Sequence, residues 1–160
     1  MNQTHIHLLI THLPIFGSIL GGLVLAQGLW TKNNQTIMAA YTIFIISTIG
    51  AGIAYLTGEA AEETVENIKG VVEVNIKQHQ QFALFALISL IILGVASLVG
   101  VFLTFKKLPF TRIVAFSILV ISLISFALAA RTGYLGGQIR HTEISNNTIS
   151  PSVNSETESD

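Results

Sequence analysis

The residues best suited to chemistry in this sequence are its five histidines, His5, His7, His12, His79 and His141. Neutral imidazole is a ligand for haem iron and for copper and zinc ions. The chain has no cysteine, which excludes thiolate metal sites, iron–sulfur clusters and covalently attached c-type haem. A metal centre in this protein would therefore rest on histidine, helped by carboxylate, methionine or backbone oxygen.

Four long apolar segments must position these histidines. Of the 160 residues, 51% are hydrophobic and only 11% are charged, and the mean hydropathy is +0.65, unlike a soluble domain. Each segment is near the roughly 20 residues that a helix needs to cross a bilayer, and lipid leaves the helix as the only open element with a satisfied backbone. We therefore predict an all-α integral membrane protein, a four-helix up-and-down bundle. The predicted spans are residues 8–30, 36–57, 81–105 and 112–134.

Two short connections, residues 31–35 and 106–111, predict that the spans form two antiparallel hairpins. The longer segment 58–78 joins the hairpins, begins with an acidic stretch and could carry a helix on the membrane surface. We expect the transmembrane domain to cover residues 1–143. A disordered polar tail is expected over residues 144–160, because the chain there is rich in Ser, Asn, Thr and Glu and has no apolar periodicity.

The basic residues indicate an orientation. Lys32, Lys106, Lys107 and Arg112 lie at the two short connections, whereas all nine carboxylate side chains lie at the opposite end of the bundle. The other four basic residues, at positions 69, 77, 131 and 140, lie at that end too, so it is the density of basic residues near the span ends that favours the short connections. Because lysine and arginine are enriched on the cytoplasmic side of membrane proteins, we expect the short connections to face the cytoplasm. The sequence thus predicts a multi-pass protein of the bacterial inner membrane with both termini in the periplasm.

This topology places all five histidines at one end of the bundle. His12 is expected just inside the first span, where Pro14 can bend the helix and where an ionisable side chain itself indicates function. His79 opens the third span, which lies diagonally across an up-and-down bundle from the first. His12 and His79 could therefore sandwich a haem iron. A weak internal repeat supports this pairing, since Thr57-Gly58 closes the first hairpin as Thr132-Gly133 closes the second.

Other polar residues at this end could complete the site. His141 is a third candidate ligand, and Arg131 and Arg140 could bind haem propionates through charge-assisted hydrogen bonds. An interfacial anchor is an equally good role for Arg131. Weaker metal-ligand candidates are Glu59, Glu62, Glu63, His5 and His7. For the glutamates a solvated helix start is the commoner role, and for the two histidines an ordinary polar role near a fraying terminus is favoured.

Small residues recur at helical spacing in three of the spans. We expect them to let the membrane helices approach closely; the room that a flat cofactor needs is the alternative explanation. The residues are Gly17 and Gly21; Ser47, Gly50 and Ala54; and Gly94, Ser97 and Gly100.

Four motifs occur together in this chain: His-Leu-Leu-Ile-Thr-His-Leu-Pro at 7–14, Tyr-Leu-Thr-Gly-Glu-Ala-Ala-Glu-Glu at 55–63, His79, and Ala-Arg-Thr-Gly-Tyr-Leu-Gly-Gly-Gln-Ile-Arg-His at 130–141. Together they resemble a family of small four-span bacterial membrane proteins of largely unknown function, some of them described as cytochrome b-like. The resemblance covers about residues 5–143. It implies functional roles for His12, Glu59, Glu62, Glu63, His79, Gly136, Gly137, Arg140 and His141. Ala60 stands where such relatives often have proline, which concerns loop shape more than chemistry.

These features predict a membrane protein that binds b-type haem through two histidines and transfers electrons at the outer face, an electron carrier more than an independent enzyme. Two alternatives stay open. One is a non-haem protein that binds copper or zinc through His12, His79, His141 and the glutamates; the other is an accessory subunit of a respiratory complex. The expected partners are the lipid bilayer, a redox protein or respiratory subunits, and as one option a second copy of the chain. No basic patch supports nucleic-acid binding.

Overall fold

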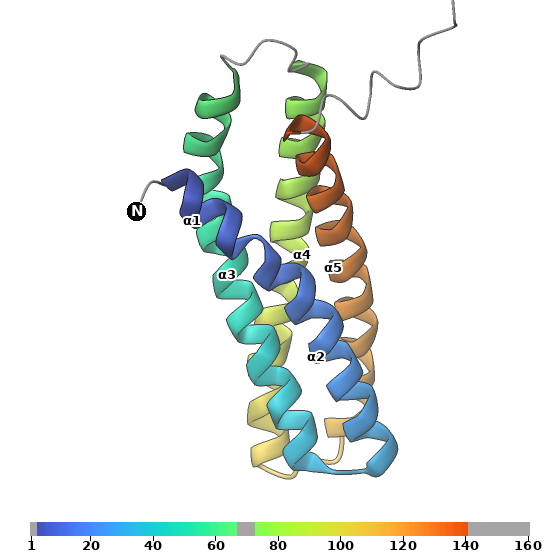
Figure 1. Ribbon diagram of the computed structural model, residues 1–160. Helices are drawn as coiled ribbons and strands as arrows, with labels where there is room; N and C mark the ends of the chain where they lie inside the picture. The colour runs from blue at the N-terminus through green and yellow to red at the C-terminus, as the bar shows by residue number, and fades with distance from the viewer. Residues whose placement is uncertain (1–2, 67–72, 141–160) are drawn as a thin grey trace, which may run out of the picture.

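The computed structural model describes residues 3–66 and 73–140, with the side chains of residues 5–58, 74 and 76–138. Five helices make up this part of the chain, and none of it forms a strand. They are α1 (Gln3–Ile10), α2 (His12–Thr31), α3 (Asn34–Glu66), α4 (Glu73–Phe105) and α5 (Thr111–Arg140). Figure 1 shows them as an up-and-down bundle in which α1 continues into α2. The predicted all-α four-helix bundle is confirmed.

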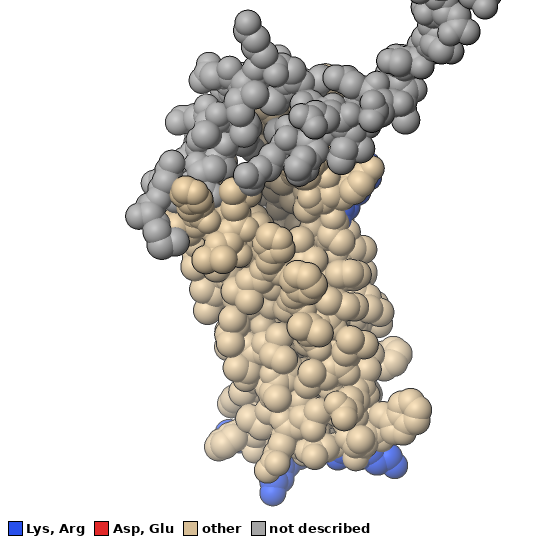
Figure 2. Space-filling view, in the orientation of Figure 1, with Lys and Arg blue, Asp and Glu red and all other residues tan. Residues whose placement is uncertain are grey.

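Four helical stretches of the described chain are long and apolar enough to cross a membrane: His5–Thr31, Asn34–Gly58, Ile76–Phe105 and Thr111–Gln138. Each contains the span predicted from the sequence. Large apolar side chains cover their outer surface, as lipid contact requires. Figure 2 shows this face of the bundle almost free of charge between its ends, with Lys and Arg side chains gathered at the lower end, where the short connections lie.

The described parts of the segment between the hairpins belong to α3 and α4, and they form no separate helix on the membrane surface. Helix α3 continues to Glu66 and α4 already begins at Glu73, so most of the segment lengthens these two helices. The alanines and glutamates of residues 59–66 have high helix propensity, which favours this continuation. Residues 67–72 and 141–160 lie outside the described part of the chain, and the disordered tail therefore stays a prediction.

Helices α2 and α4 lie diagonally across the bundle. Each of them packs against both α3 and α5, and α1 packs against α3. The predicted diagonal relation of the first and third spans is therefore present. It means that side chains on the inner faces of α1–α2 and of α4 can meet across the core.

Close contacts between helices are made where the sequence has small residues. Gly21 lies against the ring of Phe44, and Gly94 lies against the side chain of Thr48. The Thr48 hydroxyl is 2.7 Å from the carbonyl oxygen of Leu90 and 2.9 Å from that of Phe44. This hydroxyl links α3 to α4, in the way that polar side chains join membrane helices.

The first membrane-crossing unit is interrupted at Thr11, between α1 and α2. The Thr11 amide still donates to the carbonyl oxygen of His7 at 3.0 Å, and its hydroxyl donates to that of Leu8 at 3.1 Å. Pro14, one turn later, has no amide hydrogen to offer the carbonyl of Ile10. The interruption leaves α1 packed across α3 near the upper end of the bundle in Figure 1.

Candidate functional site

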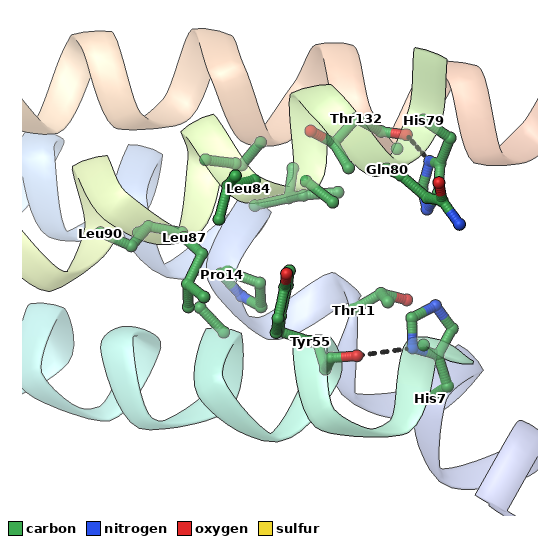
Figure 3. A pocket seen from close by; sticks show the side chains of 18 of the residues that line it. His7, Thr11, Pro14, Tyr55, His79, Gln80, Leu84, Leu87, Leu90 and Thr132 are labelled. Atoms are coloured by element: carbon green, nitrogen blue, oxygen red, sulfur yellow. Dashed lines mark hydrogen bonds between the residues drawn. The ribbon is translucent and has the colours of Figure 1, made fainter. Parts of the chain in front are cut away.

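A cavity of about 530 Å³ lies at the end of the bundle that carries the histidines, within the size range of small-ligand pockets. We call this end the histidine end. Figure 3 shows the cavity between α3 on one side and α4 with α5 on the other, with α1 and α2 closing it behind. Its described lining includes His7, Thr11, Pro14, Tyr55, Gly58, His79, Gln80, Gln81, Leu84, Leu87, Leu90, Thr132 and Gly133.

His7 lies half-buried on the α3 side of this cavity. Its Nδ1 is 2.8 Å from the carbonyl oxygen of Ala54 and 3.4 Å from the hydroxyl oxygen of Thr57. A carbonyl can only accept, so Nδ1 carries the hydrogen. In the neutral ring, Nε2 then holds the lone pair, which is the form that binds a metal.

His79 is held on the opposite wall in the same way. Its Nδ1 donates to the carbonyl oxygen of Thr132 at 3.0 Å, so that the neutral ring again has its lone pair on Nε2. Its Cε1 packs over Gly136: a Cβ added there would lie only 3.1 Å away. The ring of His7 packs over Gly58 in the corresponding manner, at 3.4 Å from such a Cβ.

His7 and His79 therefore occupy equivalent positions in the two hairpins. In each case the accepting carbonyl precedes the glycine under the ring by four residues, about one helical turn. His7 comes from the α1–α2 unit and His79 from α4, which lie diagonally across the bundle. Figure 3 shows the two rings on opposite walls, each with its second nitrogen turned toward the other ring. The repeat predicted from the sequence, which matched Thr57-Gly58 to Thr132-Gly133 and His12 to His79, is therefore in the wrong register. The structure matches Ala54 and Gly58 to Thr132 and Gly136, and it matches His7 to His79.

A seven-residue spacing explains why His7 faces the core. His7, Pro14, Gly21 and Gly28 recur every seventh residue, which keeps them on one face of the helical unit. The last three are buried and His7 is half-buried. This spacing is visible in the sequence, and it is the signal that could have identified His7.

His12 lies elsewhere. Its side chain is exposed, its Nδ1 donates to the carbonyl oxygen of Leu8 in its own helical unit at 3.0 Å, and its ring stacks on Phe16 at a centroid distance of 6.4 Å. It is not among the residues that line the cavity. His5 is exposed as well. The structure thus brings together His79 and His7, and not His79 and His12.

Arg131 also points away from the cavity. Its guanidinium carbon lies 5.7 Å from the centre of the Phe82 ring and 5.4 Å from that of Tyr134, and its side chain is exposed. Such cation–π stacking at the end of a span is typical of an interfacial anchor. No lysine, arginine or carboxylate is found among the described residues that line the cavity.

The remaining candidates are only partly described. Glu59, Glu62 and Glu63 belong to α3 and Arg140 ends α5, but their side chains, like all of His141, lie outside the described part. Among the side chains that are described, no group of three His, Asp or Glu could hold a metal ion.

The walls between the two imidazoles are lined by small and apolar side chains. Alanine and glycine are small and leave space in the cavity, and leucine side chains line its deeper part. These residues are Ala51, Ala54, Ala83, Ala86, Ala129, Gly133, Leu87 and Leu90. The cavity therefore presents two imidazoles on opposite walls, with many small and apolar side chains in the rest of its lining.

We expect Gly136→Ala to displace the His79 ring, because the new Cβ would be 3.1 Å from Cε1 and 3.4 Å from Nδ1. Gly137→Ala is the matched control, since nothing lies within 4 Å of its added Cβ. Each variant gains up to about 1 kcal/mol of helix propensity. The histidine side-chain ¹⁵N resonances, recorded in detergent, should therefore shift for His79 in Gly136→Ala alone. Unchanged His79 resonances in both variants would contradict this packing.

Comparison of the chain with protein-family models, with curated proteins and with solved structures finds no match in any of the three.

Proposed function

We propose that this protein binds b-type haem in the cavity at the histidine end, with Nε2 of His7 and Nε2 of His79 as the two axial ligands. The observation that carries the proposal is the equivalence of the two imidazoles, each fixed through Nδ1 by a carbonyl oxygen of the other helix in its hairpin. Haem with two imidazole ligands needs only this pair, one on each side of a flat ring.

The surroundings support the fit. A hydrogen bond from Nδ1 to a carbonyl orients a ligand histidine and makes Nε2 more basic, and the carbonyls of Ala54 and Thr132 serve this purpose. The small side chains of the walls give room for a flat macrocycle, and Leu87 and Leu90 keep the deeper end apolar. When bound, haem would supply one-electron chemistry at this end of the bundle.

The number of histidines described at the cavity matches haem with two imidazole ligands. Zinc sites use at least three protein ligands, and the described residues provide two histidines at the cavity. We propose further that the protein lies in a bacterial inner membrane with the histidine end toward the periplasm, where it exchanges electrons with a redox partner. The basic residues at the opposite end support this orientation.

Absorption spectra of the protein purified in mild detergent test the proposal. We expect a Soret band that shifts on reduction with dithionite, sharp α and β bands in the reduced form, and one haem b per chain by pyridine haemochrome assay. A colourless sample with stoichiometric copper or zinc would contradict the proposal in favour of a metal-binding protein. A sample with neither, after expression with ample haem, would favour an accessory subunit of a larger complex.

A further inference from the structure

Part of the cavity wall formed by α3 and α4 is exposed on the outer surface of the bundle. Tyr55 of α3 and Leu84 of α4 both line it, and their side chains are 45% and 43% exposed. Each residue lies in a stretch apolar enough to cross a membrane, Asn34–Gly58 and Ile76–Phe105. An opening at this point, between α3 and α4, would face the lipid bilayer.

The surface around this opening suits lipid. Leu56, next to Tyr55, is 81% exposed, and Phe85 and Ile88 beside Leu84 are exposed as well. The exposed amides of Gln80 and Gln81 line the cavity nearer the histidine end. A molecule in the opening would meet apolar side chains deep in the membrane and amide groups toward the water.

Two routes could lead to the space between the imidazoles. Figure 3 shows the rings of His7 and His79 at the outer end of the cavity, whereas Leu87 and Leu90 lie deeper. A flat molecule that entered along the bundle axis would reach the space between the two rings from the water. A molecule that entered between Tyr55 and Leu84 would reach the same space edge-on from the lipid.

We propose that the cavity takes its ligand from the lipid bilayer through the opening between Tyr55 and Leu84. The ligand is a flat, amphipathic ring compound that partitions into the membrane. Its apolar edge enters between the two helices, and its polar edge stays near Gln80 and Gln81. This inference rests on the proposed function, in which that compound is haem.

Haem uptake by the haem-free full chain in lipid nanodiscs tests the route. Leu84→Trp narrows the opening and should slow the Soret change about tenfold, the effect of roughly 1.4 kcal/mol on the barrier. Leu84→Ala should speed it. Leu98→Trp is the matched control, because Leu98 is 57% exposed on α4, two heptads along the same helix face, and does not line the cavity. Equal uptake rates for Leu84→Trp and Leu98→Trp would overturn the inference.

A second measurement tests the opening without haem. The chain has no cysteine, so a single spin label can be placed on the cavity wall through Leu87→Cys. Collisions with oxygen dissolved in the lipid should then exceed those with a water-soluble nickel chelate. Such a result without any haem uptake would contradict the proposed function and leave the lipid opening standing. Dominant collisions with the nickel chelate would overturn the opening itself.

Discussion

His7→Ala is expected to abolish the low-spin spectrum of the haem-loaded protein, and His79→Ala should do the same. Each substitution removes one of the two nitrogen ligands that the proposed site uses. Loss of a hydrogen-bond partner behind a ligand typically costs about 10–100-fold in metal affinity, and loss of the ligand itself should cost more. Absorption and electron paramagnetic resonance spectra, with haem content per chain, measure the effect.

His12→Ala is the matched control, and it should keep both haem content and spectrum. His12 is exposed, stacks on Phe16 and bonds only to the carbonyl of its own helical unit among the contacts described. The opposite result, a spectrum lost in His12→Ala and kept in His7→Ala, would restore the pairing of His12 with His79. Circular dichroism of each variant separates loss of haem from loss of fold.

Gly28→Ala is expected to destabilise the first hairpin strongly. The added Cβ would lie 2.8 Å from Cγ1 of Ile37 and 2.9 Å from its backbone nitrogen. Gly28 also accepts the Asn33 amide at 3.0 Å in the tight turn between α2 and α3, so neither helix end can easily move away. Overpacking of this kind typically costs about 1–3 kcal/mol, and a backbone clash belongs at the upper end. Unfolding by increasing SDS in mixed micelles, followed by circular dichroism, gives the change.

Gly52→Ala is the control for this substitution. It lies in the middle of α3, and nothing is within 4 Å of the Cβ that it would gain. Its only expected effect is a gain of up to about 1 kcal/mol in helix propensity. Equal stabilities of the two variants would mean that α2 and α3 do not meet at Gly28 and Ile37.

Two features could not be predicted from the sequence: the structure of the segment that links the hairpins, and the role of Arg131. Composition could not tell whether residues 58–78 would form a separate helix or lengthen α3 and α4, since both use the same helix-forming residues. For Arg131, the sequence is equally consistent with binding to a haem propionate and with anchoring at the membrane interface. Its position between Phe82 of α4 and Tyr134 of its own helix depends on how those two helices pack.

The sequence by itself determined the spans, the two hairpins and the position of His5, His7, His12 and His79 at one end. An open segment in lipid can satisfy its backbone hydrogen bonds only as a helix. The number of long apolar segments therefore gives the number of membrane crossings. Two crossings lie between Lys32 and Lys106, which puts both at the same end of the bundle. Two crossings likewise lie between His12 and His79, which puts both at the other end.

Only the tertiary structure decided which histidine of the first span faces His79. His7 and His12 are five residues apart on one helical unit. Their side chains therefore point in directions that differ by well over a quarter of a turn around the helix axis. Apolarity cannot choose between the two faces, because lipid and a protein core are equally apolar. Close packing determines the orientation. The glycines at positions 21 and 28 let α2 approach α3, and this places His7 toward the core and His12 on the outer surface.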